Sequence, residues 1–248
     1  MHYAIIAAGE GSRLAEEGIL EPKPLVRLCG EHMIDRLLRI FVRCGATSVS
    51  VIVNREMNSV VKHLQALETS KGCLSLGLPA DLPFQVVVDS TPSSMHSLAA
   101  LSSTIPSGPF CLTTVDTIFD EEEFVSYVSR FETEADSDGL FAVTSYVEDE
   151  KPLWVGVDDN GAITAFHDHQ HQGDCYVSGG IYCLHTQSAF PVLKQCLESG
   201  QSRMRNFQRA LVDAGLVLKA FPFSKIVDVD HASDILSAEC FLKSRQNI

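Results

Sequence analysis

The order of strand-like and helix-like segments constrains this chain more than any other feature of its sequence. In the first 135 residues, short runs rich in β-branched and aromatic residues alternate with segments whose apolar residues recur at helical spacing. The expected strands are His2–Ala7, Ser48–Val53, Phe84–Val88 and Phe110–Thr114. Helices are expected near 34–44, 57–67, 95–103 and 121–131. This alternation predicts βαβ units and an α/β fold with a mainly parallel sheet flanked by helices.

The pattern changes in the second half of the chain. Four short strands are expected at Leu140–Tyr146, Trp154–Val157, Ile163–Phe166 and Tyr176–Leu184. Turn signals such as Asp159-Asn160-Gly161 separate them, which predicts a smaller β-hairpin region. Helices near 189–198, 205–214 and 232–243 and strands near 217–221 and 226–229 complete the chain, and 72–83 is expected to be irregular. We expect one domain, 1–248, with halves at 1–135 and 136–248.

The loop after the first strand carries the most specific motif, Gly-Glu-Gly-Ser-Arg-Leu followed by Pro-Lys-Pro-Leu. Gly9 and Gly11 allow the backbone to turn sharply and to bring N–H groups close to an anion. Arg13 offers a fork of donors that suits phosphate oxygens, and the two prolines around Lys23 restrict the loop. The motif lacks the third glycine of a dinucleotide fingerprint and the Gly-Lys-Ser/Thr of a P-loop. We interpret it as a grip for nucleotide phosphates.

Charge and composition exclude several other classes. The formal net charge of −13 would repel a nucleic-acid backbone or an anionic membrane, and no basic cluster offsets it. No apolar run approaches the roughly 20 residues that span a bilayer, so we expect a soluble, cytoplasmic protein with no nucleic-acid or membrane partner. The eight cysteines form no CxxC pair and are expected to be reduced rather than zinc ligands.

The two parts of the motif together resemble the signature of the sugar-1-phosphate nucleotidyltransferase family, whose members make sugar nucleotides and related activated alcohols. The resemblance continues in the family's order through TTVDTIFDEEEF, WVGVDDNGAITAFHDH, YVSGGIYCL and IVDVDHASDI. It implies a Rossmann-like, GT-A-type sheet, in which 1–135 bind the nucleotide and 136–248 bind the acceptor. It also implies transfer of a nucleoside monophosphate from a nucleoside triphosphate to a sugar 1-phosphate, with release of pyrophosphate.

The resemblance further implies roles for single residues. The nucleotide would be bound by Ala8, Gly9, Gly11, Ser12, Arg13, Lys23, Ser94 and Asp116. Arg13 and Lys23 would be catalytic, Arg13 at the leaving pyrophosphate and Lys23 at the α-phosphate. Mg²⁺ would be held by Asp116 and Asp228. Gly180 would lie beside the acceptor, and Asp168 and His169 stand where the family usually has a Glu-Lys pair that contacts a sugar phosphate.

Three acidic positions have competing structural interpretations. Asp116 directly follows an apolar strand, which suits a metal ligand at the edge of a sheet, although a turn or cap role is also open. Asp120 precedes three glutamates and is expected to be a helix N-cap. Asp230 stands immediately before the last helix and is expected to cap it, whereas Asp228 ends a strand without such a role, so Asp228 is the expected second metal ligand.

The acceptor side leaves more alternatives open. His167, His169 and His171 alternate, so on a strand they would share one face, either as a metal site or as a solvated strand end. The loop around Ser94 lacks the family's base-reading glycine, so the base remains open. Arg203 and Arg205 are either phosphate contacts or solvated charges. Phosphocholine or a molybdopterin as acceptor, a GT-A glycosyltransferase, a silent nucleotide-binding module and a homo-oligomer all stay open.

Overall fold

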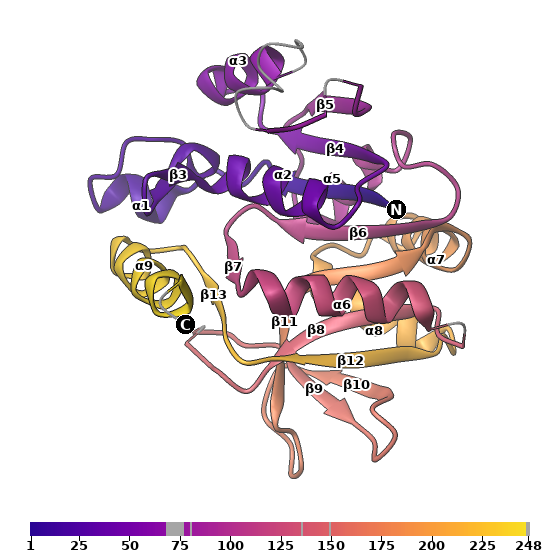
Figure 1. Ribbon diagram of the computed structural model, residues 1–248. Helices are drawn as coiled ribbons and strands as arrows, with labels where there is room; N and C mark the ends of the chain where they lie inside the picture. The colour runs from indigo at the N-terminus through magenta and orange to yellow at the C-terminus, as the bar shows by residue number, and fades with distance from the viewer. Residues whose placement is uncertain (68–76, 80, 135, 149, 247–248) are drawn as a thin grey trace.

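A mixed sheet forms the centre of the protein (Figure 1), in a computed structural model that describes residues 1–67, 77–79, 81–134, 136–148 and 150–246. Its parallel part consists of β1 (His2–Ala7), β4 (Ser48–Val53), β5 (Phe84–Val88) and β6 (Pro109–Thr114), in the order β6-β1-β4-β5. All four expected strands are confirmed to within one residue. Half of 72–83 lies outside the described residues.

The second half of the chain adds antiparallel strands to the same sheet. The long strand β11 (Tyr176–His185) pairs antiparallel with β6, with β8 (Gly139–Thr144) and with β9 (Trp154–Val157). β9 and β10 (Ile163–His167) form a hairpin, and β12 (Leu218–Phe223) runs parallel to β8. The α/β class, with a mainly parallel sheet and a hairpin region, is therefore confirmed.

Four short strands lie outside this sheet and form two pairs. β7 (Thr117–Phe119) pairs antiparallel with β13 (Ile226–Asp228), which joins the segment after β6 to the end of the chain. β2 (Arg27–Leu28) and β3 (Glu31–His32) form a small hairpin just before the first long helix.

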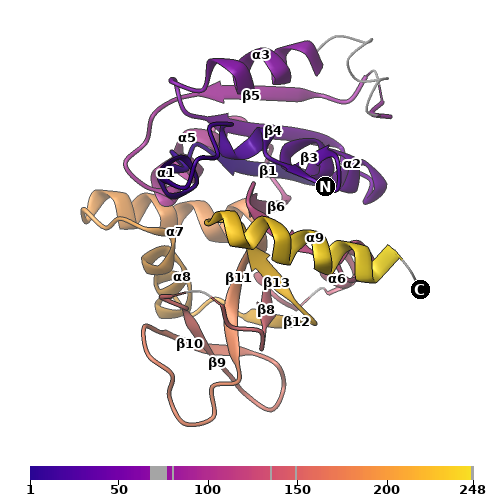
Figure 2. The ribbon, with the colours of Figure 1, turned by 90° about the vertical axis from the view of Figure 1, so that its left-hand side faces the viewer.

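Helices cover both faces of the sheet (Figure 2). One hydrophobic cluster joins a face of the sheet to α2 (Met33–Arg43), α3 (Asn58–Leu67), α6 (Glu121–Thr133) and α9 (Ala232–Gln246). A second cluster joins the opposite face to α5 (Ser94–Leu101), α7 (Thr186–Glu198) and α8 (Met204–Asp213). The described residues also form a short helix α1 (Ser12–Glu16) and the 3₁₀ turn η1 (Lys23–Leu25).

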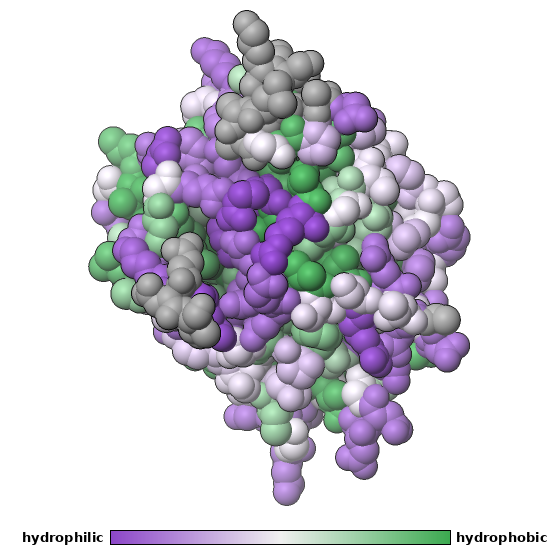
Figure 3. Space-filling view, viewed as in Figure 1, coloured by the Kyte–Doolittle hydropathy of each residue, from purple (hydrophilic) through white to green (hydrophobic). Residues whose placement is uncertain are grey.

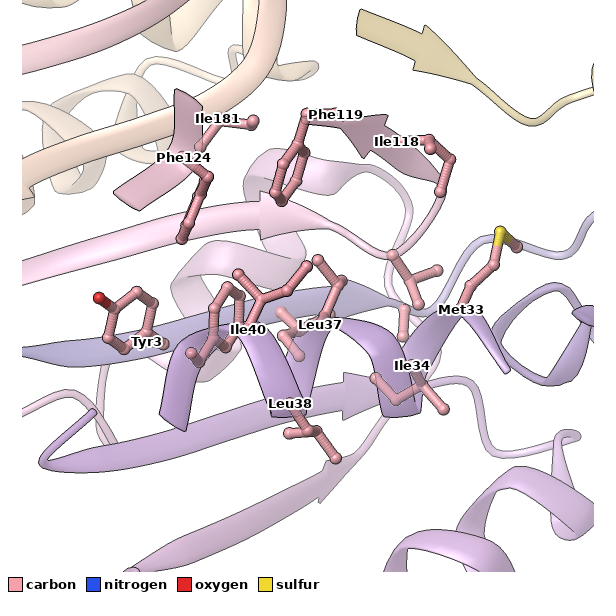
Figure 4. Packing of buried hydrophobic residues seen from close by; sticks show 14 of the residues in the cluster. Tyr3, Met33, Ile34, Leu37, Leu38, Ile40, Ile118, Phe119, Phe124 and Ile181 are labelled. Atoms are coloured by element: carbon pink, nitrogen blue, oxygen red, sulfur yellow. The ribbon is translucent and has the colours of Figure 1, made fainter. Parts of the chain in front are cut away.

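Helix α2 shows why the apolar pattern predicted its position. Ile34, Leu37, Leu38 and Phe41 recur at helical spacing and are almost fully buried in the cluster that joins α2 to the sheet and α6. Figure 4 shows the first three of them within this cluster. Burial of each such side chain contributes about 1.5–3 kcal/mol. Gly45 follows the helix with φ +70°, the left-handed conformation in which glycine commonly ends a helix.

Charged residues lie on the solvent-facing side of α2 and of the first turn of α6. Arg39 pairs with Glu31 and Glu121, and Arg43 pairs with Glu122, so the ion pairs connect α2 to the first turn of α6. Figure 3 shows hydrophilic side chains across the middle of this face. Asp120 caps α6 by accepting hydrogen bonds from the backbone N–H groups of Glu122 and Glu123, as the sequence predicted. None of the described helices has the length and apolarity needed to cross a membrane.

Candidate active site

The carboxyl ends of β1 and β6 place two predicted segments side by side. The strands run parallel with Ile6 opposite Thr114, and the backbone N–H of Val115 donates to the carbonyl of Ile6 at 3.0 Å. The glycine loop that follows β1 and the Asp116 segment that follows β6 therefore emerge at one edge of the sheet. This is the edge at which α/β sheets bind ligands.

A cavity of about 580 Å³ opens at this edge. All eight residues predicted to bind the nucleotide lie on its wall, namely Ala8, Gly9, Gly11, Ser12, Arg13, Lys23, Ser94 and Asp116. Sequence reasoning missed other polar residues of the wall, among them Glu10, Asn54 and Thr91. The cavity brings loop segments from four strands to one place, which fits a ligand as large as a nucleotide.

Only one of the two predicted glycines needs its conformational freedom. Gly11 has φ +65°, and a Cβ there would lie 3.5 Å from the Lys23 Cβ, so the loop turns directly over the lysine. Gly9 does not adopt a left-handed conformation, and a Cβ at this position would meet nothing within 4 Å. The expected sharp turn is therefore made at Gly11 alone, because a side chain is strained only at that position.

The pairing of β7 with β13 carries a second acidic segment to Asp116. Asp228 lies opposite Thr117, whose hydroxyl donates to Asp228 Oδ1 at 3.1 Å. One residue further on, the N–H of Val229 donates to the Asp116 carbonyl at 3.1 Å. Because side chains alternate along an extended chain, Asp228 and Asp230 flank Val229 on the same side. Three aspartates thus surround one point.

Lys23 holds two of these aspartates. Its Nζ donates to Asp116 Oδ2 at 2.5 Å and to Asp230 Oδ1 at 2.6 Å, and its side chain is only 8% exposed. Arg13 Nη1 donates to the other oxygen of Asp230 at 3.2 Å. The two cations predicted from the glycine loop and the Pro-Lys-Pro segment therefore meet at Asp230.

This contact corrects the expectation for Asp230. The side chain of Asp230 does not cap α9, because Lys23 and Arg13 occupy it. Instead, Asp234 Oδ2 accepts from the N–H groups of Asp230 and His231, and Glu17 accepts from the N–H of Ala232. Asp234, in the first helical turn, and Glu17, from a distant segment, therefore satisfy the backbone donors at the start of α9. The side chain of Asp230 is thus available to contact Lys23 and Arg13.

The electrostatics of the cluster follow from these contacts. Burial disfavours the charged form of Lys23, but Asp116 and Asp230 outweigh it and raise the pKa of the ammonium. Burial likewise opposes the charge of Asp230, yet Lys23 and Arg13 lower the pKa of its carboxyl. Asp228 has solvent-accessible atoms but lies within a recess of protein, and this desolvation together with the charge of Asp116 raises its pKa to about 8.

Carboxylate oxygens of this kind are the ligands that Mg²⁺ prefers. Lys23 and Arg13 balance two of the three carboxylates, and the raised pKa of Asp228 shows that the third lacks a compensating positive charge, which a divalent cation would supply. The donor set and the charge of the cluster therefore fit a divalent cation.

A second cavity of about 330 Å³ meets the first at Asp116 and Asp230. Gly180 lines it, with φ +73° and with the Thr117 hydroxyl 3.2 Å from the position of a Cβ. Three polar residues on its wall form a chain, in which Ser178 Oγ donates to Gln208 Oε1 at 2.9 Å and Gln208 Nε2 donates to the Tyr182 hydroxyl at 3.0 Å. Sequence reasoning missed this chain, since Gln208 stands within a helical pattern.

Cationic side chains also line this second cavity. Lys151, Arg203 and Arg205 lie on its wall. Arg203 has φ +72° and ψ 140°, a conformation that L-residues rarely adopt, and its N–H donates to Ser93 Oγ at 3.3 Å. Since Ser93 is the N-cap of α5, this bond ties the start of α8 to the loop that carries Ser94.

Asp168 and His169 do not line the second cavity. They line a separate hollow beside the second cavity, and the Asp168 carboxylate is paired with Arg205 at 2.7 Å and Arg209 at 2.8 Å. The structure does not bring them beside Gly180. Strand β10 also ends at His167, so the histidines at 167, 169 and 171 do not share a strand face, and the expectation of one face is wrong.

Comparisons with known proteins bear on the family and the fold of the chain. The family described as MobA-like NTP transferase domain matches residues 3–214. Comparison with curated proteins gave no sequence match. The fold is similar to those of solved structures, three of which are given below. Coverage is stated first for this chain and then for the other chain.

The first is the inositol-1-phosphate CTP transferase from T. maritima, at 17% identity, 98% and 95% coverage and TM-score 0.77. The second is a putative glucose-1-phosphate thymidylyltransferase from Bacillus anthracis, at 16% identity, 100% and 96% coverage and TM-score 0.80. The third is a UDP-glucose pyrophosphorylase complexed with UDP-glucose, at 15% identity, 98% and 99% coverage and TM-score 0.76.

Proposed function

The chain belongs to the MobA-like NTP transferase family, and on this premise we propose that it transfers a nucleoside monophosphate from a nucleoside triphosphate to the phosphate of a sugar or polyol, in the presence of Mg²⁺. The observation that carries the proposal is the meeting of two cavities at Asp116 and Asp230, beside Lys23. One cavity would hold the triphosphate and the other the acceptor, so the reacting groups would meet at the aspartates.

In the proposed reaction, a phosphate oxygen of the acceptor forms a bond to the α-phosphorus while the bond from that phosphorus to the β-phosphate oxygen breaks. Pyrophosphate leaves, and no covalent enzyme intermediate is needed. Asp116, Asp228 and Asp230 would hold Mg²⁺, which would neutralise charge on the phosphates. Lys23 would exchange its Asp116 contact for an α-phosphate oxygen, and Arg13 would bind the leaving pyrophosphate.

The wall of the second cavity favours a polyhydroxylated acceptor. Ser178, Gln208 and Tyr182 offer donors and acceptors that suit sugar or inositol hydroxyl groups. Lys151, Arg203 and Arg205 suit an acceptor phosphate. A phosphocholine headgroup would need an aromatic cage, and Tyr182 is the one aromatic residue among the described residues of this wall.

The proposal is tested by pyrophosphate release with Mg²⁺, using CTP, GTP, UTP and dTTP against sugar 1-phosphates, inositol 1-phosphate and phosphocholine. We expect release that requires both substrates and is greatest with a sugar or inositol phosphate. Release with phosphocholine alone would overturn the acceptor class, and sugar transfer from a nucleotide sugar without pyrophosphate would overturn the reaction. We expect the reaction in the cytoplasm, since the seven described cysteines are free.

A further inference from the structure

Two histidines and an aspartate gather outside both cavities. His32 is the N-cap residue of α2, Asp35 lies in the first turn of that helix, and His63 belongs to α3. Figure 1 shows α2 and α3 as separate helices at the end of the sheet that carries β4 and β5. The Asp35 carboxylate joins the two elements, because Oδ2 lies 2.9 Å from His32 Nδ1 and Oδ1 lies 2.7 Å from His63 Nε2.

The Asp35 carboxylate is almost enclosed. Its side chain is 7% exposed, compared with 17% for His32 and 26% for His63. A buried carboxylate needs polar or cationic partners, and both of its oxygens face imidazole nitrogens. The three side chains can therefore either hydrogen-bond to one another or share a bound metal ion.

The positions of the rings favour the metal. A tetrahedral ion with metal–nitrogen bonds of about 2.0–2.1 Å places its donor atoms about 3.3 Å apart and the centroids of two bound imidazoles about 5 Å apart. The His32 and His63 rings have centroids 5.1 Å apart and meet edge to face, at 84°. The donor atoms of all three residues lie within 4.8 Å of one another. Binding of an ion requires the nitrogen–oxygen separations of 2.9 and 2.7 Å to open to about 3.3 Å.

A second group of possible ligands, His167, His171 and Asp174, lacks this geometry. Its imidazoles are stacked with centroids 3.7 Å apart and an interplanar angle of 25°. At a tetrahedral ion this separation would require a nitrogen–metal–nitrogen angle of roughly 70°, far below the ideal value. It serves as an internal comparison for the first group.

We propose that His32, Asp35 and His63 form a site for a first-row transition-metal dication of the Zn²⁺ type, with water as the fourth ligand. Two imidazole nitrogens and one carboxylate suit Zn²⁺ and do not suit Mg²⁺, which prefers oxygen ligands. The ion links the start of α2 to α3, and its role is structural. Because a ligand that binds only the folded protein stabilises it, Zn²⁺ raises the unfolding temperature.

The test uses untagged, chelator-treated protein and Co²⁺ as a spectroscopic substitute for Zn²⁺. With Mg²⁺ in excess at the carboxylate cluster, we expect one equivalent of Co²⁺ to give the intense visible absorption of a tetrahedral site and Zn²⁺ to displace it. His63→Gln should weaken Zn²⁺ binding by about 100-fold or more and abolish the Zn²⁺-dependent rise in unfolding temperature. His171→Gln, the matched control in the second group, should change neither.

Two results would overturn the proposal. One is weak absorption of octahedral type from the wild-type protein with Co²⁺, a measurement that does not depend on any variant. The other is a His63→Gln protein that folds and binds Zn²⁺ as tightly as the wild type. Neither result bears on nucleotidyl transfer, because the three residues line neither cavity.

Discussion

Gly179 permits the close approach of β13 to β11, which sets the position of Asp228. A Cβ at this position would overlap Ile226 Cδ1 and would lie 3.2 Å from the carbonyl oxygen of Ala142. Gly179 is not in the left-handed region, so its replacement tests packing rather than backbone strain. We predict that Gly179→Ala destabilises the protein and that Ile226→Val relieves most of this effect.

The magnitudes follow from the atoms involved. Overpacking of a filled interior costs about 1–3 kcal/mol, and loss of one methyl group in Ile→Val costs about 0.5–1.5 kcal/mol. In Gly179→Ala/Ile226→Val the methyl group that is removed is the one that the new Cβ would meet. The two changes should therefore be non-additive by about 1–2 kcal/mol in the free energy of unfolding.

Urea unfolding of the wild type, both single variants and the double variant measures this coupling. The double variant should be about as stable as Ile226→Val. Gly9→Ala is the matched control, because a Cβ there has nothing within 4 Å, and its unfolding free energy should change by less than about 0.5 kcal/mol. Additivity of the two changes within about 0.5 kcal/mol would refute the reasoning.

Three further predictions address the site and the pH dependence. Lys23→Met should lower kcat about 10²- to 10³-fold, whereas Lys219→Met, at a partly exposed lysine that lines neither cavity, should not, and equal rates would contradict the role of Lys23. Asp228→Asn should raise the Mg²⁺ concentration at half-maximal rate, and an unchanged Mg²⁺ titration would remove Asp228 from the metal ligands. Burial and the N-terminal charge lower the pKa of His2 to about 4. Between these two pKa values the unfolded chain carries a proton on His2 that the folded protein does not carry. About 3 kcal/mol of stability should therefore be lost as the pH falls from about 6.5 to 4. His2→Gln should unfold with less pH dependence over this range, and an identical pH profile would contradict the assignment.

The sequence predicted the parts of the structure that depend on local patterns. Strands β1, β4 and β5 begin and end where apolar, β-branched runs indicated. The loop after β1 was singled out because glycines, an arginine and a proline-framed lysine occur within one short segment. Such features depend on neighbouring residues, so a single sequence reveals them.

Features that depend on distant contacts were not predictable in this way. Asp230 has the sequence context of a helix cap, and only the contact with Lys23, 207 residues away, shows otherwise. Asp168 was assigned to the acceptor by its place in a motif, but Arg205 and Arg209 from α8 hold it at the neighbouring hollow. His63 lies 28 residues from Asp35, and no local pattern connects them.

We infer that an acceptor phosphate oxygen attacks the α-phosphorus at the junction of the two cavities. An acceptor whose non-bridging phosphate oxygens carry ¹⁸O tests this step, followed by mass spectrometry of both products. We predict that every ¹⁸O label stays in the nucleoside diphosphate product, one of them in the new bridge, and that the pyrophosphate carries none. Label in the pyrophosphate, or nucleoside monophosphate released with the acceptor unchanged, would contradict it.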